Sequence, residues 1–313
     1  MKKGLLLNML RELPFSKEEL ASLIATAPYR YKVYQIPKRK PNEYRTIAQP
    51  SKEVKLLQRW LIEKVFIRLP IHKAATAYRE GISIAKHADI HAKGRFLLKM
   101  DFKDFFPSIL VKDVEKHLTK YGKLSAEEVR MVSHAVCWRD RAAGKLCVSI
   151  GAPSSPILSN AVLVEFDRQV ARVAREKKVL YSRYADDLAF STNRKGTLSE
   201  MAAEVERICS TLEYPRLRIN HEKTVFTSRR FRRVLVGLVL TPEGEISLGR
   251  EKKRRLRSEL YRFSQGSLDK AHISKLRGEL AFAWSVEKSF ILSLIRQRGV
   301  QIFQELGLPF TDN

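Results

Sequence analysis

Two adjacent aspartates, Asp186 and Asp187, lie between two segments of alternating polarity, and this stretch limits the fold more than any other. Residues 179–183 precede Tyr184-Ala185, and residues 188–192 follow the aspartates. Both segments are rich in β-forming residues, which predicts a β-hairpin with the two carboxylates at its tip. Neighbouring carboxylates repel each other unless a cation neutralises them, and Mg²⁺ prefers oxygen ligands. On its own, such a pair more often indicates a polar turn.

A third carboxylate, Asp101, ends a short apolar run. Residues 96–100 are typical of a buried strand, and Asp101 follows them directly. A charge at this place is costly without a partner. In phosphoryl transfer, two cations about 4 Å apart activate the attacking hydroxyl and stabilise the leaving oxygen. Carboxylates from different strands must converge to hold such a pair, so Asp101, Asp186 and Asp187 predict a two-metal site.

The chain carries a large positive charge. It has 59 Lys and Arg against 34 Asp and Glu, a net charge of +25 over 313 residues, and the excess is spread along the sequence. A field of this sign attracts polyanions, of which nucleic acid is the obvious one. The charge alone also allows a basic protein without a specific ligand. The length suffices for two or three small domains with apolar cores.

The first half of the chain predicts a basic hairpin. Residues 29–36 and 44–48 alternate as strands do, with a turn between them. The cations of this hairpin are Lys38, Arg39, Lys40 and Arg45. They could bind a triphosphate or lie in a solvated loop, and the residues alone favour neither.

The second half predicts a small-residue turn, further strands and a basic helical module. After the turn at residues 149–156, Ser155 is expected to cap a helix with Pro156 at its first position. Residues 217–220 and 234–240 are expected to be strands. From residue 250 the pattern becomes helical, with crowded cations at Arg250, Lys253, Arg254, Arg255 and Arg257. This face could bind nucleic acid or be a solvated helix face.

Cysteine usage and hydropathy bear on location. Three cysteines without metal-ligand spacing favour a reduced cytosol. The apolar run near residue 5 is too short for a signal peptide, and no stretch is long enough to span a bilayer. We therefore expect a cytoplasmic protein that does not bind membranes.

Taken in order, several blocks resemble those of reverse transcriptases over nearly the whole chain. These blocks are residues 45–51 (RTIAQPS), 101–106 (DFKDFF), 151–156 (GAPSSP), 184–187 (YADD), 220–224 (NHEKT) and 236–237 (VG). In its compact length and in the sequences of these blocks, the chain resembles bacterial retron reverse transcriptases. The chain departs from the retron pattern at His87, where Asn is usual, at Ile150, where Gln is usual, and at Val236, where Thr is usual.

The resemblance implies an α+β fold of the right-hand polymerase type. Fingers would comprise residues 1–95, with residues 122–148 contributing. Residues 96–249 would form a palm with a ferredoxin-like sheet, and residues 250–313 a small helical thumb that grips nucleic acid through the cations named above.

The resemblance also assigns roles in catalysis. Asp101, Asp186 and Asp187 would be catalytic and would bind two Mg²⁺ ions, with the Phe102 carbonyl assisting. Phe106 would lie under the incoming sugar and exclude a 2′-hydroxyl.

Three more residues would bind the substrate. Arg45 would hold the triphosphate with help from the turn at residues 38–40. Ala152 would line the base-pair pocket, and Lys223 would protonate the leaving pyrophosphate.

The implied function is RNA-directed DNA synthesis on a structured non-coding RNA that serves as template and primer. Retron enzymes prime from an RNA 2′-hydroxyl, use deoxynucleoside triphosphates, and leave branched RNA–DNA (msDNA) with an RNA–DNA hybrid. Such systems act in anti-phage defence, often with an effector protein. Two alternatives stay open: another bacterial reverse transcriptase, of group II intron or abortive-infection type, and a non-catalytic RNA-binding polymerase fold.

Overall fold

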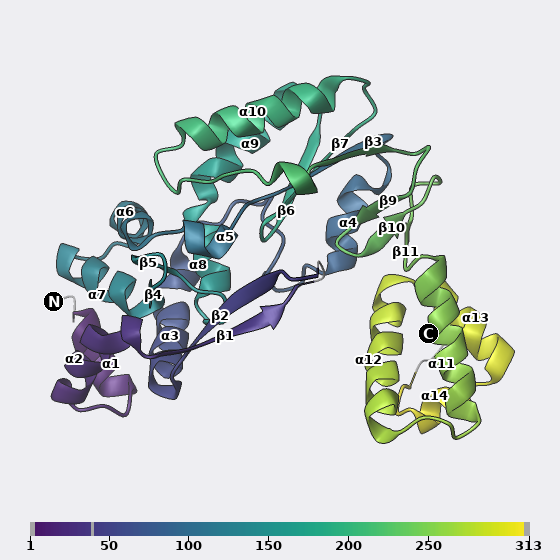
Figure 1. The fold of residues 1–313 in the computed structure, drawn as a ribbon, viewed down its shortest axis with the longest axis horizontal. Coiled ribbons are helices and arrows are strands. Elements are labelled where there is room, and N and C mark those ends of the chain that lie inside the picture. The colour runs from purple at the N-terminus through teal and green to yellow at the C-terminus, as the bar shows by residue number, and fades with distance from the viewer. Residues whose placement is uncertain (1–3, 39–40, 310–313) are drawn as a thin grey trace. The chain divides into compact units, whose positions relative to one another are not determined.

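The computed structural model describes residues 4–38 and 41–309, and Figure 1 shows its helices and strands. The chain divides into two compact units. Unit 1 comprises Met1–Glu80, Met100–Leu188 and Ser199–Thr224, and unit 2 comprises Gly81–Lys99, Ala189–Leu198 and Val225–Asn313. These units do not follow the expected boundaries near residues 95 and 249. The division into fingers, palm and thumb therefore stays a prediction.

Most elements of unit 1 are helices. They are α1 (Leu5–Glu12), α2 (Lys17–Thr26), η1 (Ala27–Tyr29), α3 (Lys52–Lys64), η2 (Phe66–Arg68), α5 (Phe105–Ser108), α6 (Val111–Tyr121), α7 (Ala126–Val136), α8 (Ser155–Val162), α9 (Val164–Glu176) and η3 (His221–Lys223). Its strands are β1 (Tyr31–Pro37), β2 (Tyr44–Pro50), β4 (Cys137–Asp140), β5 (Lys145–Val148) and β6 (Leu180–Tyr184).

Unit 2 combines α4 (Ile84–Ala92) with the C-terminal part of the chain. That part contains β8 (Val225–Ser228), β9 (Arg233–Leu235), β10 (Leu238–Leu240), β11 (Ile246–Ser247), α11 (Arg250–Ser264), α12 (Lys270–Val286), α13 (Lys288–Arg298) and α14 (Gln301–Glu305). Three elements pass from one unit to the other: β3 (Phe96–Asp101), β7 (Asp187–Thr192) and α10 (Thr197–Thr211).

A four-stranded sheet in the order β6-β7-β3-β8 confirms the α+β class. Strands β6 and β7 are the predicted hairpin, and its turn contains Ala185 at φ 57°. The order places β3, which ends at Asp101, next to β7, which begins at Asp187. Two segments more than eighty residues apart thus become neighbours.

The predicted basic hairpin is also present. Strands β1 and β2 pair antiparallel, from Tyr31 opposite Pro50 to Pro37 opposite Tyr44. Of the expected turn cations, Arg39 and Lys40 lie outside the described residues.

A glycine turn is held against β2. The Ala48 amide donates to the Ile150 carbonyl at 2.9 Å, and Gly151 follows at φ 116°. A Cβ on Gly151 would lie 3.0 Å from Ile47 Cγ2 and 3.3 Å from the Ala48 oxygen, so both conformation and space call for glycine.

Three expectations about local structure were wrong. The N-cap of α8 is Ser154, not Ser155, and its side chain makes no capping bond; the helix ends at Val162 and α9 begins at Val164. Residues 217–220 form no strand, only an isolated bridge between Phe102 and Ile219. Residues 234–240 are two strands, β9 and β10, rather than one.

The break between β9 and β10 is a two-residue turn. Val236 and Gly237 have φ of 44° and 82°, the positive pair that a tight hairpin of primed type requires. Valine favours strands and rarely adopts positive φ, so its apolar context concealed the turn.

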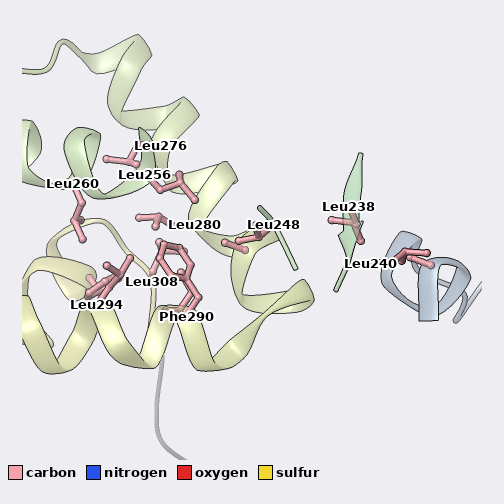
Figure 2. Close-up of a cluster of buried hydrophobic side chains, with 14 of the residues drawn as sticks. Leu238, Leu240, Leu248, Leu256, Leu260, Leu276, Leu280, Phe290, Leu294 and Leu308 are labelled. Atoms are coloured by element: carbon pink, nitrogen blue, oxygen red, sulfur yellow. The ribbon is translucent and has the colours of Figure 1, made fainter. Parts of the chain in front are cut away.

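The core of unit 2 is rich in leucine and joins its C-terminal helices to residues of α4 and of the strands. Figure 2 shows Leu280, Phe290, Leu294 and Leu308 gathered within this cluster, and all four are buried. Within residues 4–38 and 41–309, no helix has the length and apolar character that crossing a bilayer would need.

Candidate active site

Asp101 and Asp186 lie side by side. The Phe102 amide donates to the Asp186 carbonyl at 3.3 Å, so the end of β3 touches the tip of the β6–β7 hairpin. On the other side, the Asn220 amide donates to the Asp101 carbonyl at 2.8 Å. Asp101 is only 7% exposed, Asp186 is half-buried, and Asp187 is exposed. Asp101 and Asp186 are thus neighbours, and Asp187 follows Asp186 in sequence.

Burial and a neighbouring negative charge disfavour the ionised form of the Asp101 carboxyl group. Burial raises its pKa above the ordinary value of 3.8, and the negative charge of Asp186 raises it further. The opposing influence comes chiefly from Lys223, whose Nζ lies 3.1 Å from each Asp101 carboxylate oxygen. A buried carboxylate beside a second carboxylate needs a neighbouring cation to stay ionised. Lys223, one of the expected substrate-binding residues, supplies this cation.

The suitability of this site for divalent ions rests on its charge. Among the residues that the structure describes, no group of three His, Cys, Asp or Glu side chains is arranged to hold a metal ion. The donor set is nonetheless made of carboxylate oxygens, the type that Mg²⁺ prefers. One of these carboxylates already binds an ammonium group and is opposed by its neighbour. The residues fit a cation, and the metal assignment stays a proposal.

The hairpin tip is fixed by Arg183, a residue that no sequence pattern singled out. Its side chain is wholly buried and donates to Asp167 twice, Nε to Oδ1 at 2.9 Å and Nη2 to Oδ2 at 2.6 Å. Nη1 donates to Asn160 Oδ1 at 3.1 Å and to the Ala185 carbonyl at 2.9 Å. The last bond holds the residue at positive φ that directs Asp186.

A loop of unit 1 runs beside β6. The Arg183 amide donates to the Ala74 carbonyl at 2.7 Å, and the Thr76 amide donates to the Arg183 carbonyl at 2.8 Å. Asn160 Nδ2 donates to the Ala77 carbonyl at 2.8 Å. The next residue, Tyr78, has φ 60°, is half-exposed, and has a pKa raised by burial and then by the charge of Asp186. Nothing in the sequence around Tyr78 indicated that it lies at this tip.

A row of aromatic rings leads to Phe106. Phe102 packs edge-on against Phe166 with centroids 5.3 Å apart, and Phe105 stacks on Phe102 at 5.6 Å. Phe106 contacts Phe105 at 5.1 Å and is half-buried at the start of α5. The proposed sugar gate is therefore supported from the core.

The other expected substrate residues lie in the same unit. Arg45 is exposed on β2, and Ala152 is buried in the turn that β2 holds through Ala48 and Ile150. The charge of Arg45 also lowers the pKa of Asp101, and its effect is smaller than those of burial, Asp186 and Lys223. Arg45 is thus within electrostatic range of Asp101.

The cations of α11 fall into two groups. Lys253 pairs with Glu287, Arg255 Nη2 lies 2.6 Å from Glu279 Oε2, and Arg257 lies over the Phe290 ring. These three stabilise the helical module itself. Arg250 and Arg254, at the start of the same helix, are exposed and form no ion pair with another described residue.

The three departures from the retron pattern have plain structural settings. His87 and His91 are buried in α4, and burial lowers their pKa values to about 4 and about 3, with His87 adding to the second shift. His91 Nδ1 lies 2.8 Å from Ser191 Oγ. Ile150 acts through its carbonyl, and Val236 forms the turn described above.

Comparison with known proteins identifies relatives over most of the chain. A family described as "Reverse transcriptase (RNA-dependent DNA polymerase)" matches residues 36–255. The retron Ec83 reverse transcriptase of Escherichia coli is 39% identical over 272 residues, covering 86% of this chain and 87% of that protein. The retron Ec73 reverse transcriptase of Escherichia coli is 33% identical over 298 residues, covering 91% of each chain.

Solved structures show a more distant likeness. A telomerase from Candida albicans in complex with a fragment of telomeric RNA matches with 16% identity and a TM-score of 0.47, over 88% of this chain and 59% of that one. A foamy viral protease–reverse transcriptase in complex with double-stranded DNA matches with 14% identity and a TM-score of 0.48, over 88% of this chain and 43% of that one.

Replacing Asp167 by Asn is predicted to leave the buried Arg183 cation uncompensated. Loss of one partner of a buried ion pair costs about 3–5 kcal/mol of unfolding free energy. A displaced tip also slows nucleotide addition, by about 10²-fold for a shift near 1 Å. Chemical denaturation and single-turnover extension measure the two effects.

The control for this variant is Glu165→Gln on the same helix. Glu165 pairs with Lys120 and Arg168 near the surface, where such pairs contribute less than about 1 kcal/mol. Equal, small losses in the two variants would show that Arg183 does not depend on Asp167.

The α11 cations predict a difference in salt dependence. Each phosphate contact adds roughly 0.7–0.9 to the slope of log affinity against log salt. Arg250→Ala with Arg254→Ala should lower that slope for template–primer binding by about 1.5, because both side chains are exposed and neither forms an ion pair with another described residue. Arg255→Ala, which breaks an internal pair, should leave the slope as it is. A slope unaffected by the double change would remove this helix from the nucleic-acid interface.

Proposed function

Since the chain belongs to the retron-type reverse transcriptases of bacteria, which are RNA-directed DNA polymerases, we propose that it copies a structured non-coding RNA. Synthesis would start from a 2′-hydroxyl of that RNA and give branched RNA–DNA, or msDNA. The observation that carries the catalytic part is the junction of β3 with the hairpin tip, where the Phe102 amide bonds to Asp186.

The proposed reaction is attack of a priming hydroxyl on the α-phosphate of a deoxynucleoside triphosphate, with release of pyrophosphate. Asp101, Asp186 and Asp187, with the Phe102 carbonyl, would hold two Mg²⁺ ions. When bound, these ions supply activation of the hydroxyl and stabilisation of the charge on the leaving group.

The side chains of the protein bind and orient the substrate. Arg45, with Lys38 nearby in the hairpin, neutralises the triphosphate. Ala152 offers the base pair a small surface at a glycine turn. Lys223 Nζ, which Asp101 holds at 3.1 Å, gives a proton to the leaving pyrophosphate.

Phe106 selects the sugar. Its ring is supported by Phe105 and Phe102, so it cannot recede without disturbing the core. A 2′-hydroxyl on the incoming nucleotide therefore meets a fixed surface.

Membership of this family supports a proposal about the wider setting of the chain. We propose a cytoplasmic complex of this chain with its RNA and the RNA–DNA hybrid, acting in anti-phage defence together with an effector protein. The three cysteines are buried and free, which fits a reducing compartment.

Replacing Asp186 and Asp187 together by Asn separates catalysis from binding. The double variant should bind the RNA with unchanged affinity, because the tip contributes little positive surface, and should make no cDNA. Filter binding and primer extension with Mg²⁺ measure the two properties. Extension at the wild-type rate would remove the tip from the chemistry. Loss of extension together with RNA affinity would indicate a folding defect instead.

Phe106→Ala should admit ribonucleotides. Removing a steric contact in a binding pocket changes discrimination by about tenfold or more. The ratio of kcat/KM for a deoxynucleotide to that for the matching ribonucleotide measures this effect. Unaltered discrimination, with extension of deoxynucleotides intact, would mean that another residue reads the sugar.

A further inference from the structure

Three segments of unit 2 meet where β3 begins. The Arg229 amide donates to the Arg95 carbonyl at 3.0 Å, and the Arg95 amide donates to Asn193 Oδ1 at 2.8 Å. The side chains gathered here are mostly basic and exposed, and we call them the β3-start surface: Lys93, Arg95, Arg194, Lys195, Arg229, Arg230 and Arg232, with Phe231. None of them belongs to the candidate active site, because Asp101 stands at the other end of β3.

The turn between β8 and β9 is braced by Arg229, which lies in it, and by Arg233, which begins β9. The Phe231 amide donates to the Ser228 carbonyl at 2.9 Å. Arg229 Nη2 donates to the Lys93 carbonyl at 2.6 Å. Arg233 is buried and donates to the carbonyls of Gly94 and Thr241. These bonds hold the turn in one shape against the neighbouring segments.

At the tip of this braced turn stands an aromatic ring in solvent. Phe231 is 71% exposed, more than any other exposed large apolar side chain among the described residues. Arg230 and Arg232 flank it in sequence and are also exposed. An exposed ring on a braced turn, with an arginine on each side in sequence, is an arrangement on which an unpaired base can stack while the arginines bind adjacent phosphates.

Acidic neighbours offset only part of this charge. Arg232 Nη1 lies 3.7 Å from Glu251 Oε1, and both side chains are largely exposed. Glu243 is near Arg229: its pKa is lowered by hydrogen bonds from its own backbone and from Thr241, and more weakly by the Arg229 charge. Arg95 lies 5.5 Å from the centre of the Phe96 ring. The surface keeps a clear excess of positive charge.

We propose that the β3-start surface binds an unpaired segment of RNA, with Phe231 stacking on a base and Arg230 and Arg232 binding phosphates. The choice of RNA rests on the proposed function, in which the chain works on a structured RNA, and on the charge. A duplex offers no exposed base face to Phe231, so the surface distinguishes single strands from duplexes.

Phe231→Ala tests the stacking contact. The probes are a short single-stranded RNA of mixed sequence and a duplex RNA of the same sequence, each titrated against the full-length protein by fluorescence anisotropy. Affinity for the single strand should fall about tenfold, the scale of one base–aromatic stack. Affinity for the duplex should not change. Phe226→Ala is the matched control, since Phe226 is an exposed phenylalanine on β8 without flanking arginines.

Arg230→Ala with Arg232→Ala tests the phosphate contacts. For the single strand, the slope of log affinity against log salt should fall by about 1.4, or roughly 0.7 for each lost contact. The same change of charge in Arg172→Ala with Arg175→Ala, on exposed positions of α9, should leave the slope unaltered.

Two results would overturn the proposal. If Phe231→Ala left the affinity for single-stranded RNA unchanged, Phe231 would not stack on a base. The basic surface would then fit an acidic protein instead. An equal loss for single strand and duplex would rule out stacking. These binding measurements do not require catalysis, so they judge the surface even if the protein fails to copy RNA, and that failure would count only against the proposed function.

Discussion

The buried ion pair between Arg183 and Asp167 is the interaction on which the site depends. Both side chains are fully enclosed, and the guanidinium also bonds to Asn160 and to the Ala185 carbonyl. A charge in this position is costly unless every donor is satisfied. Here the donors reach helix α8, helix α9 and the hairpin tip together. The hairpin that carries Asp186 is therefore fixed by helices that supply no catalytic group themselves.

Around this ion pair, the site contains strained backbone and closely spaced charges, which a catalytic reaction can use. Ala185 and Tyr78 both have positive φ, and Asp101 is buried beside Asp186 with Lys223 as counter-charge. The positive φ angles and the opposed carboxylates oppose folding. Arg183 bonds to the Ala185 carbonyl, and Lys223 bonds to Asp101. Backbone strain and opposed charges of this kind persist only where the surrounding structure holds them in place. They are found mostly at functional sites.

The hairpin and the strand beside it could be predicted from the sequence, for identifiable reasons. Alternating strands and the Asp-Asp tip predicted the hairpin, and the apolar run before Asp101 predicted its neighbouring strand. The partners of the tip could not be found in the same way, because Asp167 lies on the apolar stripe of α9 and Arg183 within a strand, and only folding brings them together. Val236 misled the prediction, since its strand preference conceals a turn that only its backbone reveals. In α11, sequence could count the cations but not show that Lys253 and Arg255 pair internally.

We propose that the fixed tip and the end of β3 together hold two divalent cations. Electron paramagnetic resonance of Mn²⁺, titrated into the protein with a primer–template and an incoming nucleotide, tests it most directly. The account predicts two bound ions in the wild-type protein, with at least one of them lost in Asp101→Asn and both weakened in Asp167→Asn. Unchanged Mn²⁺ binding in Asp101→Asn would contradict it.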